Sequence, residues 1–187
     1  MDSYELLQFA ADTLERLHVP YLVTGSMATI THGETRFTND VDIVADLKTL
    51  HISRLCAAFQ GPEFYCSRPA VEDAIERRSQ FNVIHPTSGL KIDFMVPTDS
   101  EFNRSRLSRG QMVVTDVSGS QARFATPEDA ILKKLEYFRD GGSEKHIRDI
   151  KGVFLIQGDA IDFEYLDKWA EELGVVDQLQ GILEDTL

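Results

Sequence analysis

Asp40-Val41-Asp42, separated by thirteen residues from the preceding Gly25-Ser26, is the stretch that decides the fold of this chain. Its aspartates flank an apolar residue, and side chains two residues apart on a strand point to the same face. Two carboxylates held that close repel each other unless a cation lies between them, and a divalent metal is the usual cation. The stretch therefore predicts a metal site at the start of a strand.

The residues around the Gly-Ser pair predict a strand, a turn and a helix. Residues 21–24 are a run of aromatic and β-branched residues, and residues 27–32 have the composition of the first turns of a helix. Gly25 permits close approach of the backbone, Ser26 can cap the helix, and the free N–H groups of a helix start bind anions. The pair therefore predicts a phosphate site beside the metal site.

A third acid lies in another apolar strand, predicted over residues 90–96. The alternation of this strand places Asp93 with Lys91 on the face opposite its apolar residues. If this strand lies beside the strand of Asp40 and Asp42, the three carboxylates converge. Three such acids can bind two magnesium ions about 3.5–4 Å apart, one activating an attacking hydroxyl and one neutralising a triphosphate. The pattern thus indicates nucleotidyl transfer.

These motifs together resemble the signature of the polymerase beta type nucleotidyltransferase superfamily. The residues that carry this resemblance are Gly25-Ser26, Asp40-x-Asp42 and Asp93. With the intervening His32-Gly33-x-x-Arg36-x-Thr38, the pattern is more narrowly similar to the minimal bacterial nucleotidyltransferases that include abortive-infection toxin transferases.

The second half of the chain adds a looser resemblance to the same proteins. It rests on Thr126-Pro127-Glu128-Asp129, on Lys133 or Lys134 one helical turn later, and on the charged segment 139–149. The resemblance covers about the first 150 residues. It implies an α/β (α+β) nucleotidyltransferase fold, in which a mixed β-sheet is flanked by helices and followed by C-terminal helices.

The resemblance also implies roles for individual residues. Asp40, Asp42 and Asp93 would bind Mg²⁺ or Mn²⁺ and form the catalytic set. Gly25 and Ser26 would hold the nucleotide phosphates, and the further nucleotide contacts would come from Arg36, Thr38 and Lys133. The implied reaction moves an NMP from an NTP to an acceptor hydroxyl and releases pyrophosphate.

Simpler structural roles exist for each of these residues. Asp40 follows Asn39 and fits a turn, and a Gly-Ser pair before a helix is often only a cap. Asp93 can pair with Lys91, and Arg36 and Thr38 fit a solvated loop. Lys133 can be an ordinary exposed helix lysine. The alternative function is a catalytically silent nucleotide-binding or protein-interaction module of the same fold, such as a toxin-antitoxin component or a regulatory subunit.

Length and composition are typical of a small enzyme. The chain has 187 residues, of which 42% are hydrophobic, and we expect a core domain over residues 1–125 with a helical region over 126–187 packing on it. No apolar run approaches the roughly 20 residues that span a membrane, and no signal pattern is visible, so we expect a cytoplasmic protein. Cys56 and Cys66 lack a metal-binding spacing and are expected to be free thiols.

The formal net charge of −12 argues against nonspecific binding of nucleic acid. We interpret the basic clusters as solvated faces or partners of acids; they are Arg77-Arg78, the arginines at 104, 106 and 109, and Lys133-Lys134 with residues 145–148. The sequence does not decide whether the acceptor is RNA, a protein or a small molecule such as an aminoglycoside, nor whether a partner protein binds.

Periodicity and Gly/Pro positions predict the other elements. Helices are expected over 4–17, 47–59 and 70–75, and from 127 onward in segments that begin near 127, 143, 162 and 175. Residues 81–85 are expected to form a hairpin with the Asp93 strand, and weaker strands are predicted at 112–117 and 121–124.

Overall fold

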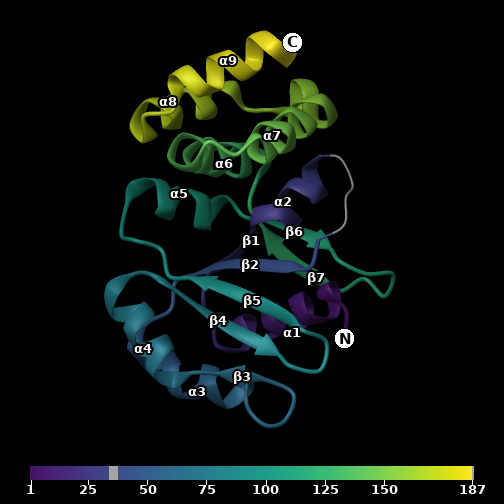
Figure 1. The fold of residues 1–187 in the computed structure, drawn as a ribbon, viewed down its shortest axis with the longest axis vertical. Helices are drawn as coiled ribbons and strands as arrows, with labels where there is room; N and C mark the ends of the chain where they lie inside the picture. The colour runs from purple at the N-terminus through teal and green to yellow at the C-terminus, as the bar shows by residue number, and fades with distance from the viewer. Residues whose placement is uncertain (34–37, 187) are drawn as a thin grey trace. The chain divides into compact units, whose positions relative to one another are not determined.

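The computed structural model describes residues 1–33 and 38–186. Those residues divide into two compact units. The first contains Met1–Met27 and Thr38–Phe124 and holds a seven-stranded mixed sheet, whereas the second contains residues 28–33 and 125–186 and is helical (Figure 1). The predicted fold class, a mixed sheet with flanking and C-terminal helices, is confirmed.

The strands of the first unit lie in the order β3-β4-β5-β2-β1-β7-β6. Their bounds are β1 Tyr21–Thr24, β2 Asp40–Ala45, β3 Tyr65–Cys66, β4 Gln80–His85, β5 Leu90–Met95, β6 Gln111–Val114 and β7 Gln121–Phe124. The helices that begin in this unit are α1 Ser3–Arg16, α2 Gly25–His32, the 3₁₀ turn η1 Thr49–His51, α3 Ile52–Ala58, α4 Arg68–Arg77 and α5 Glu101–Arg109.

One face of this sheet packs against α1 and α3. Phe94 of β5 is fully buried, and its ring centroid lies 5.9 Å from that of Phe59 at the end of α3 and 5.1 Å from that of Phe81 on β4. The ring centroid of Phe59 lies in turn 5.4 Å from that of Phe9 of α1. Because β5 alternates strictly, burying Phe94 turns Asp93 to the opposite face, as the sequence predicted.

Several local predictions are confirmed and others are corrected. The hairpin of β4 and β5 is present, and β6 pairs with β7. Helix α2 begins at Gly25, so Ser26 lies within its first turn and not before it. The helix predicted over 47–59 is η1 followed by the shorter α3, and the short strand β3 was not predicted. Helix α5 was missed because its sequence is polar, with little apolar periodicity to signal a helix.

The second unit is built from helices with clear sequence signals. They are α6 Pro127–Gly141, α7 Glu144–Gln157, the 3₁₀ turn η2 Gly158–Ala160, α8 Phe163–Leu173 and α9 Val176–Thr186. Thr126 caps α6 by accepting the Asp129 N–H, and Pro127 occupies the first helical position. Gly142, in the left-handed conformation, ends the helix.

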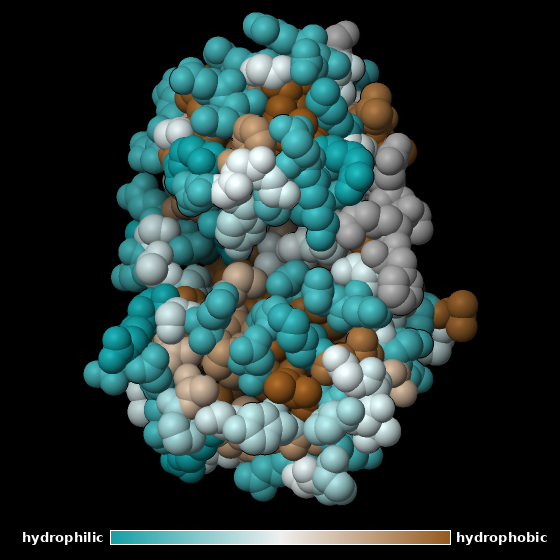
Figure 2. Space-filling model, viewed as in Figure 1, coloured by the Kyte–Doolittle hydropathy of each residue, from teal (hydrophilic) through white to brown (hydrophobic). Residues whose placement is uncertain are grey.

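Most of the basic clusters are paired with acids. Arg77 pairs with Asp73 on α4 and Lys133 with Glu136 on α6, each at 2.7 Å. These ion pairs confirm the interpretation of the basic clusters as partners of acids. Hydrophilic residues cover most of the face drawn in Figure 2, with hydrophobic residues in small groups. Lys134 and Arg106 do not lie on a solvated face, because both are buried.

The two cysteines are free, as predicted, and their side chains are within hydrogen-bonding distance of each other. Cys56 of α3 is buried and Cys66 of β3 is partly exposed. Burial of the Cys66 thiol, together with a hydrogen bond and charge repulsion from Cys56, raises the pKa of Cys66 to about 12.

The ion pair of Lys134 with Asp149 is buried in the second unit. Its atoms are 2.7 Å apart and both side chains are only 6% exposed. Replacing Lys134 with Ala leaves a buried carboxylate without this partner, and we expect the free energy of unfolding to fall by about 3 kcal/mol. Urea unfolding measures this change in the free energy of unfolding. The double variant Lys134→Met/Asp149→Leu is the control: its loss should be well below the sum of the single losses, and simple additivity would contradict the role given to the pair.

Candidate active site

The predicted aspartates meet in the centre of the sheet. Strand β2 pairs in parallel with β5, and the register places Asp42 directly beside Asp93 and Asp40 directly beside Lys91. Neighbouring strands are about 4.8 Å apart, so side chains at paired positions lie next to each other on one face. Asp40 and Asp42 share this face because they are two residues apart. The structure therefore brings all three acids to adjacent positions, as expected if the strands were neighbours.

Gly25 lies against Asp42 at the end of β1. Thr24, the last residue of β1, pairs with Asp42 across the antiparallel ladder, and Gly25 follows with a φ of +61°. A Cβ added to Gly25 would overlap the Asp42 carboxylate and lie 2.7 Å from its Cγ. Glycine is thus required here for two reasons, the left-handed backbone and the space that the carboxylate occupies.

Ser26 is buried in the first turn of α2, directly after this glycine. The first N–H groups of a helix have no partners within the helix, and the helix dipole adds partial positive charge at that end. The Gly-Ser turn therefore places a potential anion site next to the carboxylates of β2.

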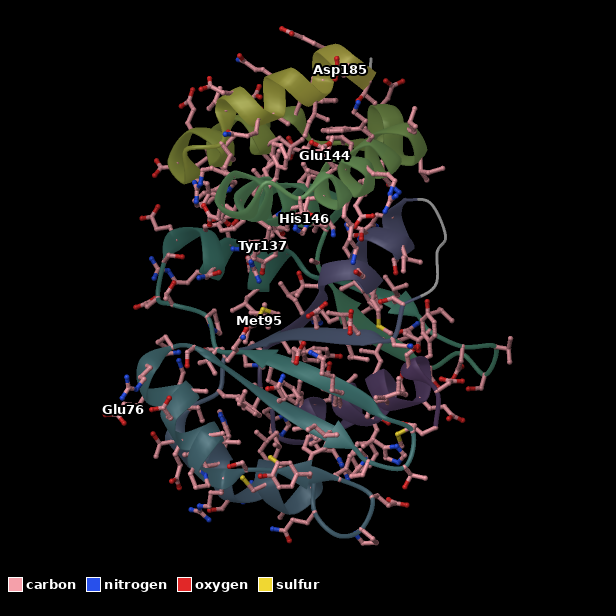
Figure 3. All side chains as sticks on the ribbon, in the orientation of Figure 1. Glu76, Met95, Tyr137, Glu144, His146 and Asp185 are labelled. Carbon is pink, nitrogen blue, oxygen red and sulfur yellow. The ribbon has the colours of Figure 1, made fainter. Side chains whose placement is uncertain are left out.

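Asp93 is held by two neighbours on the sheet. Its Oδ1 accepts a hydrogen bond from the side-chain amide of Asn82, the residue opposite it on β4. Its Oδ2 accepts one from Lys91 Nζ at 2.6 Å. Met95, labelled in Figure 3, lies two residues further along β5 on the same face. Both oxygens of the third carboxylate thus have donors from the sheet itself.

Lys91 contributes a positive charge to this group of acids. The hydrogen bond to Asp93 raises the pKa of Lys91 above its usual value, and the charge of Asp93 adds to this effect. The nearby charges of Asp40 and Asp42 act in the same direction. Lys91 is therefore protonated at neutral pH and lies among all three carboxylates.

The donor set suits a hard divalent cation at Asp40 and Asp42. Magnesium and manganese prefer carboxylate oxygen, and the missing side chain at Gly25 leaves room for the Asp42 carboxylate. Over residues 1–33 and 38–186, no three His, Cys, Asp or Glu side chains form a group that could hold a metal ion by themselves. Magnesium commonly keeps several waters and one or two carboxylates, so two aspartates are sufficient.

The other predicted nucleotide contacts have different placements. Thr38 precedes β2, and its hydroxyl accepts the Asp40 N–H at 3.3 Å, so it fixes the start of the acid strand. Arg36 lies outside the described residues. Lys133 belongs to the second unit, where it pairs with Glu136 and lies 5.2 Å from the centroid of the Tyr137 ring. Nucleotide contact by these three residues stays a prediction.

Asn82 was not identified from the sequence, although a signal was present. A hairpin that joins strands at 80–85 and 90–95 through residues 86–89 pairs position 82 with position 93. Asn82 is the amide opposite the third acid in that register. Reading the hairpin register would have identified it.

Comparison with known proteins identifies the fold. No protein-family model and no curated protein matches the sequence. Solved structures do match. The solution structure of the antibiotic-resistance factor ANT(2'')-Ia aligns with 97% of this chain and 99% of its own length, at 14% identity and a TM-score of 0.57. The chain has a nucleotidyltransferase fold.

Two further structures support this fold. The crystal structure of ANT(2'')-Ia in complex with adenylyl-2''-tobramycin aligns with 91% of this chain and 95% of its own, at 13% identity and a TM-score of 0.60. An antigenic nucleotidyltransferase-like protein from Paracoccidioides brasiliensis aligns with 98% and 92%, at 14% identity and a TM-score of 0.50. In the described part of this nucleotidyltransferase fold, no helix has the length and apolar character needed to cross a membrane.

Proposed function

We propose that the protein is a metal-dependent nucleotidyltransferase that moves an NMP from an NTP to an acceptor hydroxyl and releases pyrophosphate. The observation that carries this proposal is the register of β2 with β5, which sets Asp42 beside Asp93 while Gly25 abuts the Asp42 carboxylate. An acid pair next to a Gly-Ser helix start joins a site for cations to a site for phosphate. The nucleotidyltransferase fold of the neighbours supports the same chemistry.

Asp40 and Asp42 would hold Mg²⁺ or Mn²⁺ through their carboxylate oxygens. When bound, such an ion neutralises phosphate charge and lowers the pKa of a hydroxyl in contact with it. Thr38 keeps Asp40 at the start of β2 by accepting its N–H. The backbone N–H groups at Gly25 and Ser26 would bind the phosphates, because the left-handed turn at Gly25 leads directly into the helix start.

Asp93 would accept the proton of the attacking hydroxyl. The acceptor oxygen forms a bond to the α-phosphorus, the bond from that phosphorus to the bridging oxygen breaks, and pyrophosphate leaves with the bonding electrons. Lys91 and Asn82 hold the Asp93 carboxylate in one orientation during this step. Such positioning lowers the entropic part of the barrier.

We propose a small, cationic, hydroxyl-bearing molecule as the acceptor. The chain carries 31 acidic against 19 basic residues, and this excess repels nucleic acid and attracts amines. The similarity to ANT(2'')-Ia, whose crystal complex contains adenylyl-2''-tobramycin, supports an acceptor of this class.

The test follows transfer of label from each α-³²P NTP, with Mg²⁺ or Mn²⁺, into RNA, protein and small-molecule fractions. We expect label in the small-molecule fraction, and none with the Asp40→Ala/Asp42→Ala variant. Label in RNA or protein would retain the enzyme and overturn the acceptor class. No transfer in any fraction, together with intact NTP binding, would replace the proposal by a silent nucleotide-binding module.

A further inference from the structure

A groove of about 400 Å³ in the first unit is lined by residues of α1, its C-terminal cap and α3. Both helices pack on the face of the sheet that carries Phe94, whereas Asp93 lies on the opposite face. The groove is therefore separate from the candidate active site. Pockets that bind small molecules commonly have volumes of about 300–1,000 Å³, so a small molecule fits here. The described residues that line the groove are Phe9, Thr13, Arg16, Leu17, Arg54 and Ala58.

The charged side chains of the groove are two arginines, Arg16 from α1 and Arg54 from α3. Arg16 is held by its own helix, because its Nε donates to the carbonyl of Asp12 at 3.2 Å and its Nη2 donates to the Thr13 hydroxyl at 3.0 Å. The Asp12 carboxylate accepts a hydrogen bond from Gln8 at 2.7 Å. In the described part of the chain, no carboxylate forms a salt bridge with either arginine. The groove thus carries two positive charges in a chain whose formal net charge is −12.

The two guanidinium groups of the groove favour a doubly charged anion. Each guanidinium can donate two parallel hydrogen bonds to phosphate oxygens, and this geometry makes arginine well suited to phosphate recognition. A phosphate monoester carries a charge of about −1.5 to −2 at neutral pH, whereas a carboxylate carries a charge of about −1. Phosphate therefore matches the charge of the groove better than carboxylate does.

The other residues of the groove provide an apolar surface beside this charge. Phe9 is half-buried, and its ring centroid lies 4.9 Å from that of Phe64 in a stacked arrangement and 5.4 Å from that of Phe59. These neighbours fix the orientation of the Phe9 ring, and Leu17 and Ala58 line the same groove. A fixed aromatic surface binds a flat apolar group at little cost in entropy. Inorganic phosphate would leave this surface uncovered, so the groove suits an organic phosphate.

We propose that this groove is a second binding site of the protein, which takes a small phosphate monoester that carries an aromatic ring. The phosphate of this ligand contacts the guanidinium groups of Arg16 and Arg54, and its ring packs against Phe9. The proposal goes beyond the proposed function and stands independently of it, because the residues of the groove differ from those of the candidate active site.

Titration of the ¹⁵N-labelled protein with phenyl phosphate, in a buffer free of divalent cations and phosphate, tests the site. Chemical shifts of the backbone amides locate the ligand, and we expect saturable shifts at residues 9–17 and 54–58 with a dissociation constant below about 1 mM. Inorganic phosphate lacks the ring and benzyl alcohol lacks the charge, so each should bind these residues at least about fivefold more weakly. Equal affinity for inorganic phosphate or benzyl alcohol would overturn the proposal, as would the absence of saturable shifts in these two segments.

Paired substitutions separate direct contacts from the overall charge of the chain. Arg16→Gln/Arg54→Gln removes both guanidinium groups of the groove and should weaken the binding of phenyl phosphate by at least about tenfold. The matched control is Arg68→Gln/Arg77→Gln on α4, which removes the same number of charges from two arginines that pair with acids outside the groove. We expect the affinity of this control to lie within about twofold of the wild type. Equal weakening in the two double variants would contradict the proposal, because only long-range charge would then act.

Folding is controlled by thermal melting and by the single variant Arg54→Gln. Arg54 is exposed, so we expect its substitution to leave the fold intact, whereas Arg16 bonds to its own helix. Arg54→Gln alone should weaken the binding of phenyl phosphate by at least about threefold. Unchanged binding in this folded variant would overturn the proposal. Since the titration contains neither NTP nor metal, its failure would leave the proposed nucleotidyl transfer untouched.

Discussion

Replacing Asp42 with Asn is expected to lower the rate of nucleotidyl transfer by at least about a thousandfold while the fold remains intact. Asn has nearly the same shape but lacks the charge that would hold the metal. Asp42 pairs with Thr24 across the sheet. Its carboxylate lies against Gly25, and a Cβ at position 25 would overlap it. The initial rate of label transfer at saturating NTP measures the effect, and thermal melting reports on folding.

A matched control for this variant exists just beyond the same strand. Asp46 follows the other end of β2 and pairs with Lys48 at 2.7 Å, so Asp46→Asn removes an equal charge without touching the site. We expect transfer within about twofold of the wild type for this control. Retained activity in Asp42→Asn, or an equal loss in Asp46→Asn, would refute the role of Asp42 as a metal ligand.

Replacing Gly25 with Ala is expected to impair both stability and transfer. Alanine at position 25 would have to adopt the left-handed backbone conformation, which is unfavourable for a residue with a Cβ. Its methyl group would also overlap the Asp42 carboxylate, which would have to move away. We expect the free energy of unfolding to fall by about 2–4 kcal/mol and transfer to fall by at least about a hundredfold. Urea unfolding and the same transfer assay measure the two effects.

Gly89→Ala separates the two causes. Gly89, in the hairpin loop, has a similar φ of +71°, but no atom lies within 4 Å of a Cβ added there. In this variant we expect the free energy of unfolding to fall only by the cost of the left-handed backbone, about 1–2 kcal/mol, and the transfer rate to stay unchanged. If Gly25→Ala is no worse than Gly89→Ala in either measurement, the Asp42 carboxylate does not depend on the space at Gly25.

The central strands of the fold could be predicted because their sequences carry simple periodic signals. Phe94 and Asp93 are neighbours with opposite character, so the period of two assigns one to the core and one to the open face. The Gly25 turn and the β4–β5 hairpin were likewise signalled by local residues. These features depend on contacts within short stretches of the chain.

The features that could not be predicted from the sequence depend on contacts between distant stretches of the chain or on weak periodicity. Whether Asp42 meets Asp93 is decided by the pairing of β2 with β5, and the parallel register between them leaves no local signature. The role of Lys91 among three acids follows only from that register. Burial of Lys134 was not foreseen, because Asp149, the acid that neutralises it, lies on another helix.

The thiol pair has a practical consequence for chemical labelling. Only the thiolate reacts with maleimides, and a pKa raised to about 12 by burial keeps Cys66 in its unreactive thiol form at pH 7. Cys56 is buried. A cysteine introduced at an exposed position such as Val117 should therefore react far faster than either native thiol. The natural sequence can thus serve directly as the background for single-site fluorescent or spin labels.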